Sequence, residues 1–476
     1  MYSHADSHKR WWALAILCLG VLMIVLDTTI VNVALPSIRA DLHFSATGLV
    51  WVVNAYMLTF GGFLLLGGKL GDLYGHRKLF LAGIVLFTLA SLACGLAQSQ
   101  AMLIVARAVQ GLGGAVVSAV ALSLIMNLFT EPAARAKAMG VYGFVCAGGG
   151  SIGVLLGGLL TSQLNWHWIF LVNLPIGVAV FALCMALIAP GAGQTGHKLD
   201  IGGAITVTGS LMLAVYAVVN GNEAGWGSVQ TLGLLGTAVV LLALFIVIES
   251  RVASPLMPLG LFRLRNVATA NVAGVLWAAA MFAWFFISAL YMQLVLGYSP
   301  LQVGLAFLPA NLIMAAMSLG LSAKIVMRFG FRGPLAFGLA LAAAGLAWFA
   351  RAPAGGSFVV DVLPGMVLLG TGAGIAFNPM LLAAMSDVSP EDSGLASGVV
   401  NTAFMMGGAL GLAVLASLAA ARSGAQLAAG ASSAVALTAG YNLAFAVGAL
   451  FALVAAGLGA YFMRNAAIPA EAPEHA

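Results

Sequence analysis

Long apolar runs separated by short polar segments make up almost the whole chain. The runs are about 20 residues long, which is the length a helix needs to cross a hydrocarbon core about 30 Å thick. The alternating strands that a membrane β-barrel requires are absent from the sequence. This pattern predicts an all-α integral membrane protein with 14 transmembrane helices. The spans fall at about 11–34, 49–67, 79–97, 101–126, 138–160, 169–189, 201–220, 231–249, 269–291, 302–322, 334–350, 360–383, 395–420 and 440–463.

Composition supports the membrane assignment. The 476 residues are 62% hydrophobic and only 7% charged, whereas a soluble domain has about 25% charged residues. The net charge of +5 comes from lysines and arginines in loops, so it gives no reason to expect nucleic acid as a partner. All four cysteines lie inside apolar runs, and we interpret them as small core residues without a disulfide or metal role.

The distribution of basic residues predicts the orientation. With a cytoplasmic N-terminus, most lysines and arginines fall on the cytoplasmic side, as the positive-inside rule requires. Arg39, Arg351 and Arg422 fall outside, and Arg107 falls within a span. The first apolar run is too long for a signal peptide, and this indicates a first transmembrane helix that is retained. We therefore expect a multi-pass protein of a bacterial inner (plasma) membrane with both termini in the cytoplasm.

An internal repeat predicts two parallel halves. The loop after span 2 resembles the loop after span 10, and the loop between spans 4 and 5 resembles the loop between spans 12 and 13. The matching residues are Lys69 with Lys324, Gly75 with Gly330, Arg77 with Arg332, Pro132 with Pro390, and Gly140 with Gly398. Repeats that place the same loops on the same side are related by an axis along the membrane normal. We predict a six-helix bundle in residues 1–190, two inserted helices in 191–250, an interfacial connector in 251–268 and a second six-helix bundle with a short polar tail in 269–476.

Several stretches together resemble one family. They are LDTTIVNVALPSI, GKLGDLYGHRKLF, VARAVQGLGGA, GGGSIGVLLGG, WHWIFLVNLPIG and VLGYSPLQVGLAFLP. The chain resembles the major facilitator superfamily, and specifically its fourteen-helix drug:proton antiporters of the EmrB/QacA type. The resemblance covers roughly residues 11–465 and implies two six-helix bundles that rock around a central site.

The loop between spans 2 and 3 resembles the family's cytoplasmic gate motif. We give the name gate motif to Gly68, Gly71, Asp72, Gly75, Arg77 and Lys78. The glycines permit a tight turn, and Asp72 is expected to bond to a neighbouring helix end while the basic pair supplies the opposite charge. The alternative is a basic loop that only sets topology.

Asp27 is the one carboxylate well inside a predicted span, and Arg107 is the one cation. At 1.5 Å per residue, both lie roughly 9–12 Å from the outer boundary, so they could face each other across the first bundle. Gln110 shares a helix face with Arg107. Burial favours the protonated form of a carboxyl group and a nearby cation favours the ionised form, so a contact that opens and closes would couple protons to conformation. The alternative is a permanent structural ion pair.

Two further groups of residues are site candidates. Gly149, Gly153, Gly157 and Gly158 resemble the antiporter motif of helix 5, although Val154 replaces the usual proline. The glycines are expected to allow close packing and bending against the other half. The candidates for a substrate cavity are Asn54, Tyr56, Trp277, Phe282, Phe285, Asn311 and Asn378.

The sequence favours proton-coupled export of amphipathic, often cationic drugs or antibiotics. Its expected partners are protons, the substrate and the lipid bilayer, and the sequence names no partner protein of an export complex. No phosphate-binding loop, metal-ligand spacing or catalytic constellation is recognisable, so we expect no cofactor, no metal and no enzyme activity. Three alternatives stay open: a dedicated exporter of one metabolite or self-made antibiotic, an uptake symporter, and a membrane sensor or scaffold subunit without transport.

Overall fold

The computed structural model describes residues 4–129, 131–188, 199–317, 321–386, 388 and 393–464. Lys198, Pro390, the predicted domain boundary at 190–191 and the polar tail after 464 lie outside these residues. The helices are α1 (His4–Leu42), α2 (Val50–Tyr74), α3 (His76–Gly95), α4 (Gln100–Leu128), α5 (Pro132–Gln163), α6 (Trp168–Leu171), α7 (Asn173–Leu187), α8 (Ile201–Ala224), α9 (Val229–Arg251), η1 (Leu259–Arg263), α10 (Arg265–Leu290), η2 (Tyr291–Val295), α11 (Pro300–Ala316), α12 (Ser322–Phe329), α13 (Arg332–Phe349), η4 (Phe358–Val362), α14 (Leu363–Met385), α15 (Ser393–Ala428) and α16 (Ser433–Phe462).

Thirteen helical segments of the described chain are long and apolar enough to cross a membrane. The shorter apolar helix α11 lies in the predicted span 302–322, and that span extends across residues 318–320, outside the described part. Together they account for the 14 predicted spans, and the protein is a multi-pass membrane protein.

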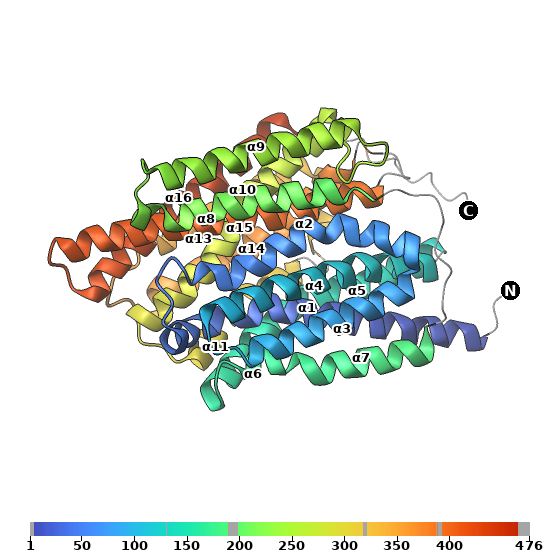
Figure 1. Cartoon of the computed structure of the whole chain (residues 1–476), viewed down its shortest axis with the longest axis horizontal. Coiled ribbons are helices and arrows are strands. Elements are labelled where there is room, and N and C mark those ends of the chain that lie inside the picture. The colour runs from blue at the N-terminus through green and yellow to red at the C-terminus, as the bar shows by residue number, and fades with distance from the viewer. Residues whose placement is uncertain are drawn as a thin grey trace.

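The helices run side by side in two bundles (Figure 1). In the first, α4 packs against α2 and α3, and α1 packs against α5 and α7. In the second, α13 packs against α14 and α16, and α10 packs against α15 and α16. The inserted helices α8 and α9 pack on each other along one edge of the molecule, and α8 also contacts α2 and α15.

Glycine allows the tightest helix contacts, and it does so in corresponding places of the two halves. A Cβ added to Gly113 of α4 would lie 2.7 Å from the backbone nitrogen of Phe87 in α3. A Cβ on Gly372 of α14 would lie 2.6 Å from the backbone nitrogen of Ala342 in α13. Small residues at such crossings let helix backbones approach closely where lipid supplies no hydrophobic drive. The shared geometry is consistent with the predicted repeat.

The loop glycines of the repeat also share a conformation. Gly75 has φ +91° and Gly330 has φ +72°, in the region that favours glycine. The matched arginines bond alike: the Arg77 guanidinium donates to the Met185 carbonyl of α7 (2.8 Å), and the Arg332 Nε donates to the Ala460 carbonyl of α16 (2.6 Å).

The halves contact each other along α2 and α15. The Asn54 amide of α2 donates to the Ala409 carbonyl of α15 at 2.8 Å. Further along, a Cβ added to Gly61 would lie 3.0 Å from Met405. The inserted helix α8 lies against both of these helices, so it supports the seam between the halves.

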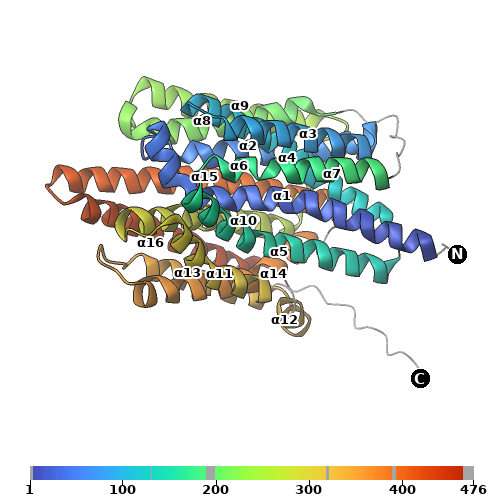
Figure 2. The same cartoon turned by 90° about the horizontal axis from the view of Figure 1, so that it is seen from below.

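On the opposite side, α5 and α11 contact each other at the end away from the N-terminus. A Cβ on Gly158 would lie 2.6 Å from the Pro300 carbonyl oxygen, and one on Gly304 would lie 2.9 Å from that of Val154. Toward the N-terminal end of α5, a Cβ on Gly140 or Gly143 would have no neighbour within 4 Å. Figure 2 shows α1 and α5 extending beyond α12 and α14 in this direction.

Candidate functional site

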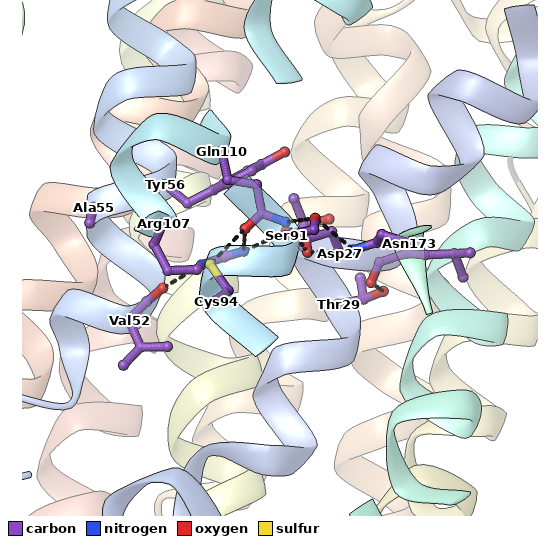
Figure 3. Close-up of polar contacts among 12 residues, drawn as sticks. Asp27, Thr29, Val52, Ala55, Tyr56, Ser91, Cys94, Arg107, Gln110 and Asn173 are labelled. Carbon is purple, nitrogen blue, oxygen red and sulfur yellow. Dashed lines mark hydrogen bonds and ion pairs between the residues drawn. The ribbon is translucent and has the colours of Figure 1, made fainter. Parts of the chain in front are cut away.

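Asp27 lies on α1 in the interior of the first bundle and is completely buried. Its Oδ2 forms an ion pair with the Arg107 guanidinium of α4, and its Oδ1 accepts a hydrogen bond of 2.7 Å from the Gln110 amide (Figure 3). The sequence predicted that Asp27 and Arg107 could face each other, and the structure brings them into direct contact together with Gln110.

The Arg107 side chain is held by more than its carboxylate partner. Its Nε donates to the Val52 carbonyl of α2 at 2.9 Å, and its terminal nitrogen donates to the Gln110 Oε1 at 2.7 Å. The guanidinium also lies 4.5 Å from the centre of the Tyr56 ring and 5.6 Å from that of Phe170, so both rings make cation–π contacts. Only 1% of Arg107 is exposed. The carboxylate, the hydrogen-bond acceptors and the two rings together compensate the guanidinium for the loss of water.

The sequence analysis missed two members of this site. The Asn173 amide of α7 donates to the Asp27 Oδ1 at 3.1 Å and to the Ser91 hydroxyl of α3 at 3.3 Å. The Gln110 amide also donates to Ser91, at 2.6 Å. Each is a polar residue in an apolar run, and that signal alone does not say which helix face it occupies. We call Asp27, Ser91, Arg107, Gln110 and Asn173 the Asp27 cluster.

The geometry of the Asp27 cluster is that of an enclosed ion pair. The Asp27 oxygens accept from Arg107, Gln110 and Asn173, which come from α4 and α7. An ionised carboxylate is an acceptor only, and donors of this kind satisfy it. Because removing one partner from a buried pair leaves an uncompensated charge, separating the carboxylate from Arg107 is costly unless water or another positive group compensates it. A proton or a cationic ligand would serve.

Asp72 of the gate motif contacts the start of the next helix. Its carboxylate lies 3.1 Å from Nε2 of His76, which is the first residue of α3 and so a neighbouring helix end; its role as a latch stays a prediction. Asp72 is half exposed, and the turn at Gly75 starts α3 so that His76 faces it. Arg77 reaches α7 as described above, and Lys78 is exposed.

The glycines of α5 divide between two neighbours. Added Cβ atoms on Gly149, Gly153 and Gly157 would meet α1, at Val25, Leu26 and Thr29, and Ile30 respectively. Only Gly158 of the four meets the other half, at Pro300 and Leu301. The expected packing against the other half is therefore found at Gly158, whereas the other three glycines fit α5 against the helix that carries Asp27.

The candidates for a substrate cavity lie in different settings. Tyr56 lies on Arg107, and its hydroxyl has no hydrogen-bond partner among the described residues. Asn54 bonds across to α15, and Trp277 is buried in α10. Phe282 contacts Phe404, with ring centres 5.8 Å apart, and Phe285 stacks on Phe307 at 5.3 Å. Asn311 is buried and its amide nitrogen has no partner among the described residues, and Asn378 is half-buried.

Comparisons with known proteins agree with this architecture. The family model described as Major Facilitator Superfamily matches residues 17–412. A bacterial homologue of the human lysosomal transporter Spinster, solved in an inward-facing and unoccupied conformation, superposes with a TM-score of 0.65 at 16% identity, over 95% of this chain and 96% of that one.

Curated relatives are closer in sequence. The puromycin resistance protein of Streptomyces alboniger is 40% identical over 86% of this chain and 81% of its own length. The cephamycin export protein of Amycolatopsis lactamdurans is 40% identical over 85% of this chain and 84% of its own. The multidrug resistance protein Stp of Mycobacterium tuberculosis is 38% identical over 85% and 74%.

These matches confirm the resemblance stated from the motifs, and the 14 helical spans fit the EmrB/QacA type. They also confirm the predicted fold class. The chain belongs to the major facilitator superfamily, a family of transporters.

Proposed function

We propose that this protein exports amphipathic, often cationic small molecules across a bacterial inner membrane in exchange for protons. Both termini would face the cytoplasm, and the two bundles would alternate access to a central site. The observation that carries the proposal is the Asp27 cluster, in which one carboxylate and one guanidinium are buried together inside the first bundle. Ionisable residues at such depth are costly and mark ion or proton pathways.

The coupling step is a change of partner at Asp27. In the described conformation the carboxylate is paired with Arg107 and shielded from solvent. A rotation of α1 relative to α4 would separate the two, and a proton would then compensate the buried carboxylate. Return of the helices would restore the pair and expel the proton. A cationic substrate could compete for the same carboxylate.

The contacts between the halves support an inward-open state under this orientation. The α5–α11 contact lies at the end that we assign to the outside, whereas a Cβ added to Gly140 or Gly143, near the cytoplasmic end of α5, would meet no atom within 4 Å. The contact of Asp72 with His76 at the start of α3 stays within the first bundle and does not reach the second, which fits a gate motif that is released in this state. Outward opening would require the gate motif to engage.

A single carboxylate well inside the predicted spans, Asp27, favours one proton per transport cycle. Exchange of one proton for one monovalent cation moves no net charge, so only the pH gradient would drive it, at about 1.4 kcal/mol per pH unit. A neutral substrate would also gain from the membrane potential, at about 2.3 kcal/mol per 100 mV.

A second candidate is a dedicated exporter of one compound. It is favoured by the names of the relatives, since the proteins for puromycin, cephamycin, tetracenomycin C and lincomycin are each named for one antibiotic. The multidrug resistance protein Stp supports the broader range instead.

A substrate screen separates these candidates. Cells lacking their own drug exporters would express the wild type or Asp27→Asn, and intracellular accumulation of a panel of cationic and neutral antibiotics and dyes would be measured. Multidrug export predicts lowered accumulation of several unrelated scaffolds, which Asp27→Asn abolishes. Lowered accumulation of a single scaffold would identify a dedicated exporter. Unchanged accumulation of every compound, with the protein present in the membrane, would count against transport and favour a sensor or scaffold.

A further inference from the structure

A pair of acids is buried where the inserted helices meet α2. Asp200 caps the start of α8, and Glu249 lies in the last turn of α9. Each is only 4% exposed. One oxygen of each carboxyl group has a backbone donor: Asp200 Oδ1 accepts from Gly203 N at 2.7 Å, and Glu249 Oε2 accepts from Met257 N at 3.0 Å. These bonds fix both side chains in place.

The other two oxygens approach the same point at Gly203, and no described residue donates to either of them. Asp200 Oδ2 and Glu249 Oε1 are buried and have no hydrogen-bond partner among the described residues. Both converge on Gly203, where an added Cβ would lie 2.6 Å from each oxygen. The two carboxyl groups therefore face each other across this one point. Two ionised carboxylates have no hydrogen to share, whereas one proton turns this contact into an O–H···O⁻ hydrogen bond.

In the described part of the chain, one basic group faces the pair. The Lys69 ammonium of α2 interacts with both carboxyl groups electrostatically, but no ion pair within 4.0 Å joins it to either one in the described part of the chain. It donates instead to the carbonyls of Ser254 and Pro255 in the connector, at 2.8 and 2.6 Å. One positive charge balances one negative charge, so a single proton on the pair leaves the three groups neutral together.

Among the described residues, no further charged side chain is buried beside the pair. Leu66, Ala204 and Leu256 form a buried apolar cluster at this point. The nearest other charged residues on the same elements are exposed: Arg251 on α9, Arg263 in η1, and Asp72 on α2, which is paired with His76. Lys198 lies outside the described residues. Two bare carboxylates in such a setting would repel each other without water to screen them.

We propose that Asp200 and Glu249 bind one proton between them and form a proton site separate from the Asp27 cluster. The proton comes from water and sits between Asp200 Oδ2 and Glu249 Oε1, with Lys69 as the counter-charge. The site joins the start of α8, the end of α9, the connector and α2, which carries part of the gate motif. Loss of the proton would leave a second negative charge and draw Lys69 away from the connector carbonyls.

This site can be tested on purified protein without a transport assay, so the result does not depend on the proposed export function. Infrared spectra in lipid nanodiscs at neutral pH would be compared between wild type, Glu249→Gln and Asp200→Asn, before and after H/D exchange. A protonated carboxyl group has a carbonyl band that shifts on deuteration. Glu223→Gln is the matched control, because Glu223 lies in α8 and is exposed.

We expect one protonated-carboxyl band in the wild type and in Glu223→Gln, and its loss in both Glu249→Gln and Asp200→Asn. In each amide variant the new NH₂ donates to the remaining carboxylate, so both variants are expected to fold. Loss of the band in either variant is enough to assign the proton to the pair. A spectrum of Glu249→Gln or Asp200→Asn that keeps the full wild-type band would overturn the proposal, because both acids would then be ionised in the native protein.

Discussion

Gly157 offers a direct test of how closely α5 must pack against α1. A Cβ on Gly157 would lie 2.6 Å from the Ile30 carbonyl oxygen and 3.2 Å from the Ile30 Cα. Both atoms are backbone, so no side-chain rotation relieves the clash. To reach an ordinary contact of 3.4 Å, α1 must move by about 0.8 Å relative to α5. Ile30 lies less than one turn from Asp27, so this displacement reaches the Asp27 cluster.

The expected cost follows from the rigidity of the contact. Forcing an extra methyl group into a well-packed interface costs about 1–3 kcal/mol. The matched control is Gly148→Ala. Gly148 lies in the same helix α5, and an added Cβ there has no neighbour within 4 Å. In that variant the better helix propensity of alanine is expected to stabilise by up to about 1 kcal/mol.

The assay is thermal unfolding of both variants in the same detergent, followed by transport in liposomes. We expect a lower melting temperature for Gly157→Ala than for the wild type, an unchanged or higher one for Gly148→Ala, and slower transport only in Gly157→Ala. Equal stability and equal transport in the two variants would refute the close fit of α5 on α1 and its connection to Asp27.

Three further predictions concern the charged groups. Arg107→Met leaves Asp27 buried without its counter-charge and is expected to cost about 3–5 kcal/mol of stability in thermal unfolding. Adding Asp27→Asn should recover much of this loss. If the losses of the two single variants instead add up in the double variant, a direct pair is contradicted. Arg77→Met removes an exposed hydrogen bond to the Met185 carbonyl, so its stability cost should stay below about 1.5 kcal/mol, and a larger loss in the same assay would mean that the gate motif is locked in this state. Export of a monovalent cation in liposomes should respond to the pH gradient but not to an imposed membrane potential, and a clear response to the potential would require a stoichiometry other than one proton per cation.

Much of the fold follows from the sequence because bilayer thickness fixes the helix length. Apolar run lengths located the spans, and the repeated loops indicated two corresponding halves. The contact between Asp27 and Arg107 was predictable for a related reason. Both are costly at that depth, and both lie at a similar distance from the predicted outer boundary.

Other features depend on helix rotation and crossing, which span lengths do not specify. Ser91 and Asn173 face Asp27 because of how α3 and α7 are rotated, and no pattern in either run reports that rotation. Asp72 was expected to reach a neighbouring helix end, and the sequence did not say which one; the turn at Gly75 makes it the start of α3, at His76. The glycines of α5 signalled close contact without naming the partner, which for three of them is α1.

The most direct test of the central claim is proton release by purified protein in liposomes. A pH gradient would be imposed, a pH-sensitive dye enclosed, and a panel of cationic and neutral drugs added to wild type and Asp27→Asn, with Glu223→Gln as a folded control that loses an exposed acid. We predict substrate-triggered proton movement in the wild type and in Glu223→Gln, and its loss in Asp27→Asn. Equal proton movement in wild type and Asp27→Asn would contradict the assignment and leave Asp27 as a structural or substrate-binding residue.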